Sequence, residues 1–348
     1  MQISSETLID FVKRIVEAAG VPAEFSQLVS DSLVASNLRG VDSHGVQLLR
    51  FYLEQIAAGD VNPKARGQVV SENGCCLLFD GENGLGQVVA TQCCQHSVRL
   101  ARHHGLGMVV ARESNHFGAA AYWAQKFSDQ GLIGIVMCNA SPAVPPWQGK
   151  EGRIGTNPLC VSVPGDGKKL WLLDMATTTV AANKIFQAHL EGKPEIPTGW
   201  ALDAEGVPTT DTKAAYQGLP MPLGGYKGSG LGMMSEILCA VLGGGAMSTE
   251  LGGIRIRGRA FRVSQMYLGI DVERFMPLPV FVARMERLIG VIKSAAPARG
   301  YDEVLVAGEP EWRAEELRRR EGIPLGEGTW GSLVEAAERL GVSVPGVG

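Results

Sequence analysis

The sequence of 348 residues lacks the short motifs that mark several large classes of nucleotide-binding and hydrolytic proteins. It has no Gly-x-x-x-x-Gly-Lys-[Ser/Thr] phosphate loop and no Gly-x-Ser-x-Gly nucleophile turn. No complete Gly-x-Gly-x-x-Gly follows an expected strand, because residues 83–87 and 227–232 match that fingerprint only in part. The sequence therefore argues against a P-loop nucleotidase, an ordinary serine hydrolase and an ordinary Rossmann site.

Long apolar runs and an excess of positive charge are also missing. No uncharged apolar stretch reaches the roughly 18 residues of a membrane span, and the segment Met1-Gln-Ile-Ser-Ser-Glu6 has neither the basic nor the apolar part of a signal peptide. The net charge of −4 gives no broad electrostatic footprint for nucleic acid or an anionic membrane. We therefore expect a cytoplasmic protein whose partners are small molecules, with no nucleic acid and no membrane among them.

Cysteine and histidine are scarce, with seven and six residues. The cysteines include the pairs Cys75-Cys76 and Cys93-Cys94, but they form neither Cys-x-x-Cys nor a Cys/His zinc spacing. We expect reduced thiols in the core and no metal site. Four arginines at near-alternating spacing between residues 255 and 262 favour one solvated strand face or a subunit contact over a polyanion site.

The hydrophobic pattern predicts a helical start followed by a mixed α/β region, and the length favours two or three domains. Helical spacing predicts helices over 8–19 and 25–40, and a third from Asp42 or Ser43 towards Gly59. Short apolar runs predict strands at 76–79, 108–111, 133–137, 160–163 and 170–173, with more strand between 255 and 270. Helices are expected at 88–103, 119–127, 180–189 and 231–242, and two charged ones at 311–320 and 332–340. These runs do not decide between parallel and antiparallel pairing.

The segment Gly40-Val-Asp-Ser-His-Gly-Val46 places a titratable imidazole between two glycines at the start of the expected third helix. With Ser43 or Asp42 as the cap, the positive end of the helix dipole favours a neutral His44, and such a histidine exchanges protons well near its pKa. The alternative is a histidine that only satisfies a buried carbonyl. Ser43 beside His44 also suggests a hydrolase nucleophile, but adjacent side chains on one turn point apart.

A second histidine lies in Ser114-Asn-His-Phe-Gly118, after an expected strand and before a helix. Such corners of α/β proteins commonly expose reactive side chains, and Gly118 allows a ligand to approach closely. The competing interpretation is a structural histidine bonded to Ser114 or Asn115. Two such sites in a chain with six histidines favour proton transfer over packing.

Three further segments offer groups suited to a dinucleotide. Gly224-Gly-Tyr-Lys-Gly-Ser-Gly230 supplies backbone amides and the Lys227 ammonium for a pyrophosphate, or it is a glycine-rich turn with a solvated lysine. Gly155-Thr-Asn-Pro158 and Asp174-Met-Ala-Thr177 place short polar groups at strand ends. Asp174 could accept ribose hydroxyls or cap the next helix, and the sequence alone favours the cap.

Together these segments resemble the type 2 malate/L-lactate dehydrogenase family. The resemblance covers nearly the full chain in matching order, through segments 39–46, 114–118, 155–158, 174–176, 199–201 (Gly-Trp-Ala), 226–230 and 307–309 (Ala-Gly-Glu). That family also includes ureidoglycolate, sulfolactate and diketogulonate oxidoreductases and a cyclic imine carboxylate reductase. Its members use NAD(P)H without a Rossmann domain.

The resemblance implies an α/β (α+β) fold in which a non-Rossmann dinucleotide-binding domain has a largely antiparallel central sheet. A helical domain would be built from both chain ends, with an N-terminal unit at 1–70 joined by 300–348, and 71–299 would form the NAD(P)-binding and catalytic region. The resemblance also implies a homodimer whose subunits share the active-site clefts, and NAD (NADH) as the cofactor, with NADP as the alternative.

The resemblance further implies that His44 or His116 exchanges the proton with the substrate oxygen, and Ser43 completes the catalytic candidates. Cofactor contacts carry over to Ala140, Thr156, Asn157, Asp174, Met175, Ala176, Lys227, Gly308 and Glu309. Many family members carry an arginine four residues after the first histidine, where it grips the substrate carboxylate, but this chain has Leu48. Arg39 or a residue of the partner subunit would then have to hold the anion.

The function that follows is hydride transfer between the nicotinamide and C2 of a small 2-oxo or 2-hydroxy acid, with malate or L-lactate favoured. The same groups could serve a cyclic imine carboxylate reductase, in which the proton goes to nitrogen. From a different class, the chain could be a nucleotide-binding regulator without turnover.

Overall fold

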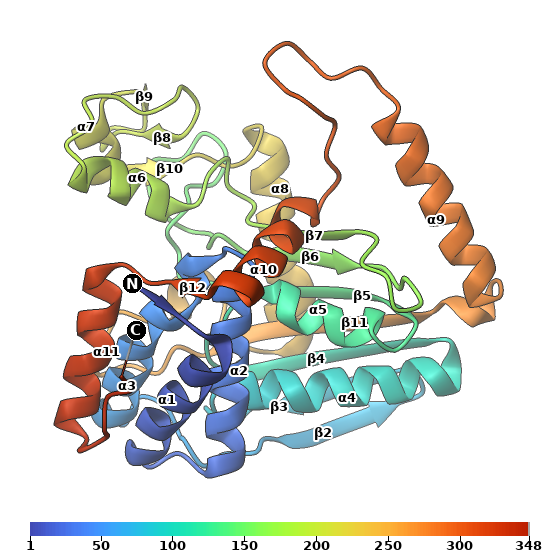
Figure 1. Ribbon diagram of the computed structural model, residues 1–348, viewed down its shortest axis with the longest axis horizontal. Coiled ribbons are helices and arrows are strands. Elements are labelled where there is room, and N and C mark those ends of the chain that lie inside the picture. The colour runs from blue at the N-terminus through green and yellow to red at the C-terminus, as the bar shows by residue number, and fades with distance from the viewer. Residues whose placement is uncertain (347–348) are drawn as a thin grey trace.

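The computed structural model describes residues 1–346 and has a seven-stranded sheet at its centre (Figure 1). In spatial order the strands are β2 (Gln68–Asn73), β3 (Cys76–Asp80), β4 (Leu106–Ser114), β11 (Val263–Asp271), β5 (Leu132–Cys138), β6 (Leu159–Ser162) and β7 (Leu172–Met175). The β3–β4 pair is parallel and the other five pairs of this sheet are antiparallel. The fold is therefore mixed α/β with a largely antiparallel sheet.

Helices cover both faces of this sheet. The helices α4 (Gly86–His104) and α5 (Ala120–Ser128) pack on one face, and the π-helical η3 (Glu236–Val241), which continues α8 (Tyr226–Ser235), packs on the other. Successive residues of β4 serve the two faces in turn, since Val109 belongs to the α4 and α5 core and Val110 to the η3 core. The central strands of the sheet are thus buried on both sides, whereas the edge strand β2 is exposed.

The N-terminal and C-terminal parts of the chain share one apolar cluster. It joins α1 (Ser5–Ala18), α2 (Ala23–Leu38) and α3 (Leu49–Ala58) to α11 (Glu327–Arg339). Strand β1 (Gln2–Ile3) pairs with β12 (Ile323–Pro324), and α10 (Glu309–Glu321) precedes that strand (Figure 1). Ser4 caps α1 by accepting the Thr7 N–H, as the sequence predicts. The division into domains at residues 70 and 300 stays a prediction.

Two smaller parts flank the sheet. A lobe of α6 (Ala182–Leu190), β8 (Ala201–Leu202), β9 (Pro208–Thr209), α7 (Thr212–Gln217) and β10 (Leu219–Pro220) has its own small apolar cluster. The helix α9 (Leu278–Lys293) projects from the body, and residues 294–306 return from it to α10 (Figure 1). The short helices η4 (Ser248–Glu250) and η5 (Val272–Arg274) complete the elements. No helix in residues 1–346 has the length and apolar character needed to cross a bilayer.

Several predictions from the sequence are wrong in detail. The strand expected at 170–173 is β7 at 172–175, so Asp174 lies within a strand and pairs with Cys160. The strand expected from Arg255 begins only at Val263, and the preceding arginines lie in a loop where Arg262 pairs with Glu113. Five of the seven free cysteines are buried, but Cys75 is only half-buried in the turn between β2 and β3, and Cys76, the first residue of β3, is exposed.

Candidate active site

A cavity of about 690 Å³ lies between β7, the N-terminus of α5 and the segments 39–44 and 305–311. Its volume is within the range of small-molecule sites. Residues predicted from the sequence form much of its wall: Ser43, His44, Thr156, Asp174, Met175, Ala176 and Gly308. The fold therefore brings together seven site residues from four distant parts of the sequence.

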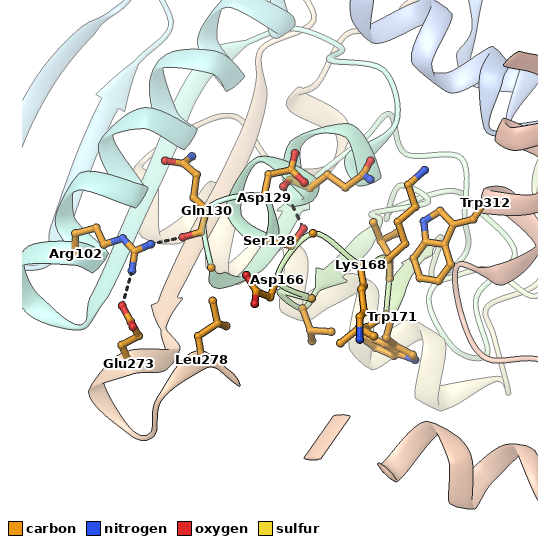
Figure 2. Close-up of a pocket in the computed structure, with 18 residues that line it drawn as sticks. Arg102, Ser128, Asp129, Gln130, Asp166, Lys168, Trp171, Glu273, Leu278 and Trp312 are labelled. Atoms are coloured by element: carbon orange, nitrogen blue, oxygen red, sulfur yellow. Dashed lines mark hydrogen bonds and ion pairs between the residues drawn. The ribbon is translucent and has the colours of Figure 1, made fainter. Parts of the chain in front are cut away.

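Another cavity, of about 420 Å³, lies beside the turn between β6 and β7 and contains none of these residues (Figure 2). At its rim Arg102 pairs with Asp271 and Lys168 with Glu286. No histidine lines it, its Asp166 is exposed on the turn, and its Trp171 is half-buried directly before β7. We assign the chemistry to the larger cavity, because that cavity holds the candidate proton exchanger.

Residues 42–58 do not form the single helix predicted from the sequence. Two 3-10 turns, η1 (Asp42–His44) and η2 (Val46–Leu48), precede α3, and the chain is extended at Gly45. The reason is Asn37, whose Oδ1 accepts the Val46 N–H at 2.8 Å and would lie 2.2 Å from a Cβ on Gly45. A single 3-10 turn has little dipole, so the helix-dipole explanation for a neutral His44 is wrong. Burial lowers the pKa of His44 instead.

Long-range hydrogen bonds hold this segment in place. The Arg318 guanidinium of α10 donates to both carboxylate oxygens of Asp42, at 2.7 and 3.0 Å, and Asn37 Nδ2 donates to Asp42 Oδ1 at 2.6 Å. Fork-like arginine–carboxylate pairs fix geometry as well as charge. Sequence reasoning missed Arg318, because 276 residues separate it from Asp42 and no local pattern marks the pair.

The two candidate histidines lie together. The rings of His44 and His116 stack with centroids 5.7 Å apart and planes at 22°. Ser43 Oγ lies 3.0 Å from His44 Nδ1, within hydrogen-bond distance, and so orients that ring. The expectation that these adjacent side chains point apart is therefore wrong. His44 lines the cavity, whereas His116 lies behind it against Tyr52 and Asn115.

His116 is fixed by its own loop and by α3. Its Nδ1 accepts the Gly118 N–H at 3.2 Å and lies 2.7 Å from the Tyr52 hydroxyl, so Nε2 carries the proton of the neutral ring. Burial, reinforced by the neighbouring His44, lowers the pKa of His116 to about 3. The bonds to Ser114 or Asn115 that the competing interpretation requires are not formed, and the Asn115 amide donates to Asn83 and Gly84 instead. Tyr52 was also missed from the sequence.

Asp174 connects β7 to α5. Its Oδ2 accepts the Ala121 N–H at 2.9 Å, so it caps α5 and not the helix that follows it in sequence. Asp174 is exposed to the open cavity, but the surrounding walls desolvate its carboxylate, and this desolvation raises its pKa to about 6, opposed by the Ala121 hydrogen bond and the charge of Arg39. A carboxylate with such a pKa can exchange protons or accept hydrogen bonds from ribose hydroxyls.

Comparison with known proteins identifies the family. Residues 3–334 match the family model described as malate/L-lactate dehydrogenase. The chain belongs to this family. The malate dehydrogenase of Pyrococcus horikoshii is 37% identical over 350 residues, which cover 98% of this chain and 96% of the relative. Its solved structure matches with a TM-score of 0.90 at 35% identity, over 99% of this chain and 96% of that one.

Two other members of the comparison differ in the substrate that their names state. The ureidoglycolate dehydrogenase (NAD(+)) of Escherichia coli K12 is 31% identical over 338 residues, covering 97% of this chain and 96% of the relative. The structure of delta1-piperideine-2-carboxylate reductase from Pseudomonas syringae matches with a TM-score of 0.84 at 26% identity, over 97% of this chain and 100% of that one. The predicted family and the prediction of a hydroxy acid dehydrogenase are confirmed.

Four predicted cofactor residues of this malate/L-lactate dehydrogenase family member do not line the cavity. Asn157, at φ 32°, is buried and its side chain bonds the Ala140 N–H, the Gly232 carbonyl and Glu236. These hydrogen bonds hold the 155–158 loop against α8. The Ala140 N–H is already donated to Asn157 in this network. Glu309 accepts the Val306 N–H at 3.0 Å and pairs with Lys293, so it shapes the loop beside Gly308.

Lys227 lies exposed in the first turn of α8, which begins at Tyr226 and not near Leu231 as predicted. Its contact with a phosphate stays a prediction. Leu48 packs in the apolar cluster of α1 to α3, where 8% of its surface is exposed, whereas Arg39 lies on the cavity wall. No group of three or more metal-ligating side chains occurs in the described part of the chain.

Proposed function

We propose that this protein interconverts a small 2-hydroxy acid and its 2-oxo acid with NAD as the hydride carrier, and that malate or L-lactate is the substrate. The observation that carries the proposal is the shared cavity wall, on which the His44 and Ser43 pair faces the cofactor residues carried over from the family. The names of the P. horikoshii and E. coli relatives support a hydroxy acid and NAD.

The residues present fit a nicotinamide dinucleotide. Thr156, Asp174, Met175, Ala176 and Gly308 would hold it, and the small side chains of α5 leave the backbone accessible. Asp174 favours NAD over NADP, because a carboxylate accepts ribose hydroxyls and repels a 2′-phosphate. When bound, the nicotinamide supplies the hydride donor or acceptor.

Within this site, His44 exchanges the proton with the substrate oxygen. It lies on the cavity wall with Nδ1 oriented by Ser43, so Nε2 is the nitrogen available for exchange. The carboxylate of a bound 2-oxo acid favours the charged imidazole and would raise the pKa that burial lowers. His116 positions this ring by stacking, since its own Nδ1 is occupied by Tyr52 and Gly118.

We also propose that two copies form a homodimer. The projecting α9 exposes Leu288 (51%) and Val291 (63%), and the α8 and η3 surface exposes Met233 (59%), Val241 (57%) and Leu242 (59%). Large apolar surfaces on a chain of this size mark interaction sites. The projection of α9 from the body supports an exchange of contacts between two subunits (Figure 1).

A second candidate is the reduction of a cyclic imine carboxylate, which the similarity to the P. syringae reductase favours. His44 would then deliver its proton to nitrogen. The test is an NADH absorbance assay with oxaloacetate, pyruvate and a cyclic imine carboxylate, repeated with NADPH. We expect the highest kcat/KM with a 2-oxo acid and NADH. A preference for the imine would establish the second candidate, and NADH binding without any turnover would indicate a regulator.

A further inference from the structure

Arg39, the residue that follows α2, carries a buried guanidinium without a partner. Only 6% of the residue is exposed, and neither its Nε nor its Nη1 has a hydrogen-bond acceptor in the structure. An unsatisfied buried charge is costly, so natural proteins pair such groups or reserve them for a ligand. Arg39 lies on the wall of the 690 Å³ cavity.

Asp174, a carboxylate on the same cavity wall, does not satisfy this guanidinium. The positive charge of Arg39 opposes the rise in the pKa of Asp174, which shows that the two groups sense each other. They nevertheless form no ion pair within 4.0 Å in the described residues. One carboxylate oxygen of Asp174 instead accepts a hydrogen bond from the Ala121 N–H.

The N-terminus of α5 faces the same cavity, through Gly118, Ala119, Ala120 and Ala121. The first amides of a nine-residue helix have no acceptor within the helix, and the helix dipole adds partial positive charge there. Asp174 takes the Ala121 amide, while the Ala119 and Ala120 amides precede it on the same turn. Alanine side chains leave room for a ligand oxygen to approach them.

We propose that Arg39 and the first amides of α5 form a binding site for an oxyanion of the reactants. The inference rests on the proposed function, which offers two sources of that chemistry: the pyrophosphate of the dinucleotide and the carboxylate of the 2-oxo acid. A guanidinium fork and backbone amides suit either anion. If the carboxylate is the anion bound, the site supplies the grip on the substrate that Leu48 cannot provide.

The experiment compares Arg39→Met with Arg50→Met, a matched control on the exposed surface of α3. Three quantities are measured: the Kd of NADH by fluorescence, the KM of oxaloacetate at saturating NADH, and the Kd of inorganic pyrophosphate by calorimetry. Arg39→Met should weaken at least one ligand roughly tenfold to a hundredfold, the range of a charge-assisted hydrogen bond, and the control should not. Weaker NADH and pyrophosphate binding assigns the site to the cofactor, and a raised KM alone assigns it to the acid.

Wild-type values of all three quantities in Arg39→Met would overturn the proposal. If that variant does not fold, Arg39→Lys replaces it, with an expected loss of about fivefold for the same ligand because an ammonium cannot form the fork; unchanged affinities there would also overturn it. In Arg39→Met/Asp174→Asn, restored affinity would mean that Arg39 only neutralises Asp174, and would overturn the proposal. If the wild type turns over no acid but binds pyrophosphate through Arg39, the result refutes the proposed function and still supports the oxyanion site.

Discussion

Replacement of His44 by alanine tests the assignment of the proton exchanger. The structure places this ring on the cavity wall, with Nδ1 oriented by Ser43 at 3.0 Å, so the variant removes the positioned acid and base without removing the cofactor residues. General acid–base catalysis contributes roughly 10²–10⁴-fold, which corresponds to about 3–5.5 kcal/mol of barrier at 1.36 kcal/mol per decade. We therefore expect kcat to fall by that factor while the Kd of NADH changes less than about threefold.

The assay is steady-state oxidation of NADH by oxaloacetate, with binding followed separately by fluorescence. His103→Ala is the matched control, because His103 lies exposed on α4 outside the cavity. Stacked behind His44, His116 positions the ring, so His116→Ala should lower kcat by a smaller factor and change the pH profile. If His44→Ala keeps a kcat within threefold of the wild type, or if His116→Ala loses more activity than His44→Ala, the assignment is wrong.

Three further predictions follow from charge and exposure. Burial lowers the pKa of His116 in the folded protein to about 3, below its usual 6.5, so its contribution to stability is present above about pH 6.5 and is lost as the pH falls towards 3. In His116→Gln, the urea concentration at the unfolding midpoint should therefore change less with pH over this range than in the wild type. Parallel pH profiles for the two proteins would contradict this prediction. Lys227→Ala should weaken NADH binding, with a difference that shrinks as salt rises because the lysine is exposed, and an unchanged Kd would identify a solvated lysine. Val291→Glu on α9 should shift the mass measured by light scattering from dimer to monomer, whereas Arg284→Gln on the same helix should not; a dimer that persists in Val291→Glu would place the interface elsewhere.

Local patterns in the sequence predicted the strongly periodic elements. Helix α1 has apolar residues at helical spacing and a serine cap, and the cores of β4 and β5 are continuous apolar runs, so their type follows from burial alone. Strand β2 was missed because all six of its residues are exposed and carry no alternation. Helix α9 was missed although Leu278, Val282, Met285, Ile289 and Ile292 recur at helical spacing, so its type could have been predicted from the sequence. That only Val282 of this helix is fully buried could not.

The candidate site depended on contacts that no local pattern records. The break at Gly45 follows from the position of the Asn37 amide, and the hold on Asp42 comes from Arg318 at the other end of the chain. The prediction that Asp174 caps the next helix was wrong, because tertiary packing places its carboxylate at the N-terminus of α5 instead. The site residues were predicted through family motifs, whereas the proposals for their roles rest on the geometry.

One short connection explains how a largely antiparallel sheet can serve a dinucleotide. Residues 115–119 join β4 to α5, and within them His116 stacks on His44 while the Gly118 N–H fixes the ring. Gly118 has a φ of +82°, a conformation that glycine adopts without strain, and the chain turns there into the first amides of α5. The ring that positions the proton exchanger and the amides proposed to bind an oxyanion are therefore fixed by the same backbone. A Rossmann fold binds the pyrophosphate at the N-terminus of a helix that follows a parallel strand. In the proposed site the N-terminus of α5 would likewise bind the anion, and it follows β4, which forms the one parallel pair of the sheet with β3.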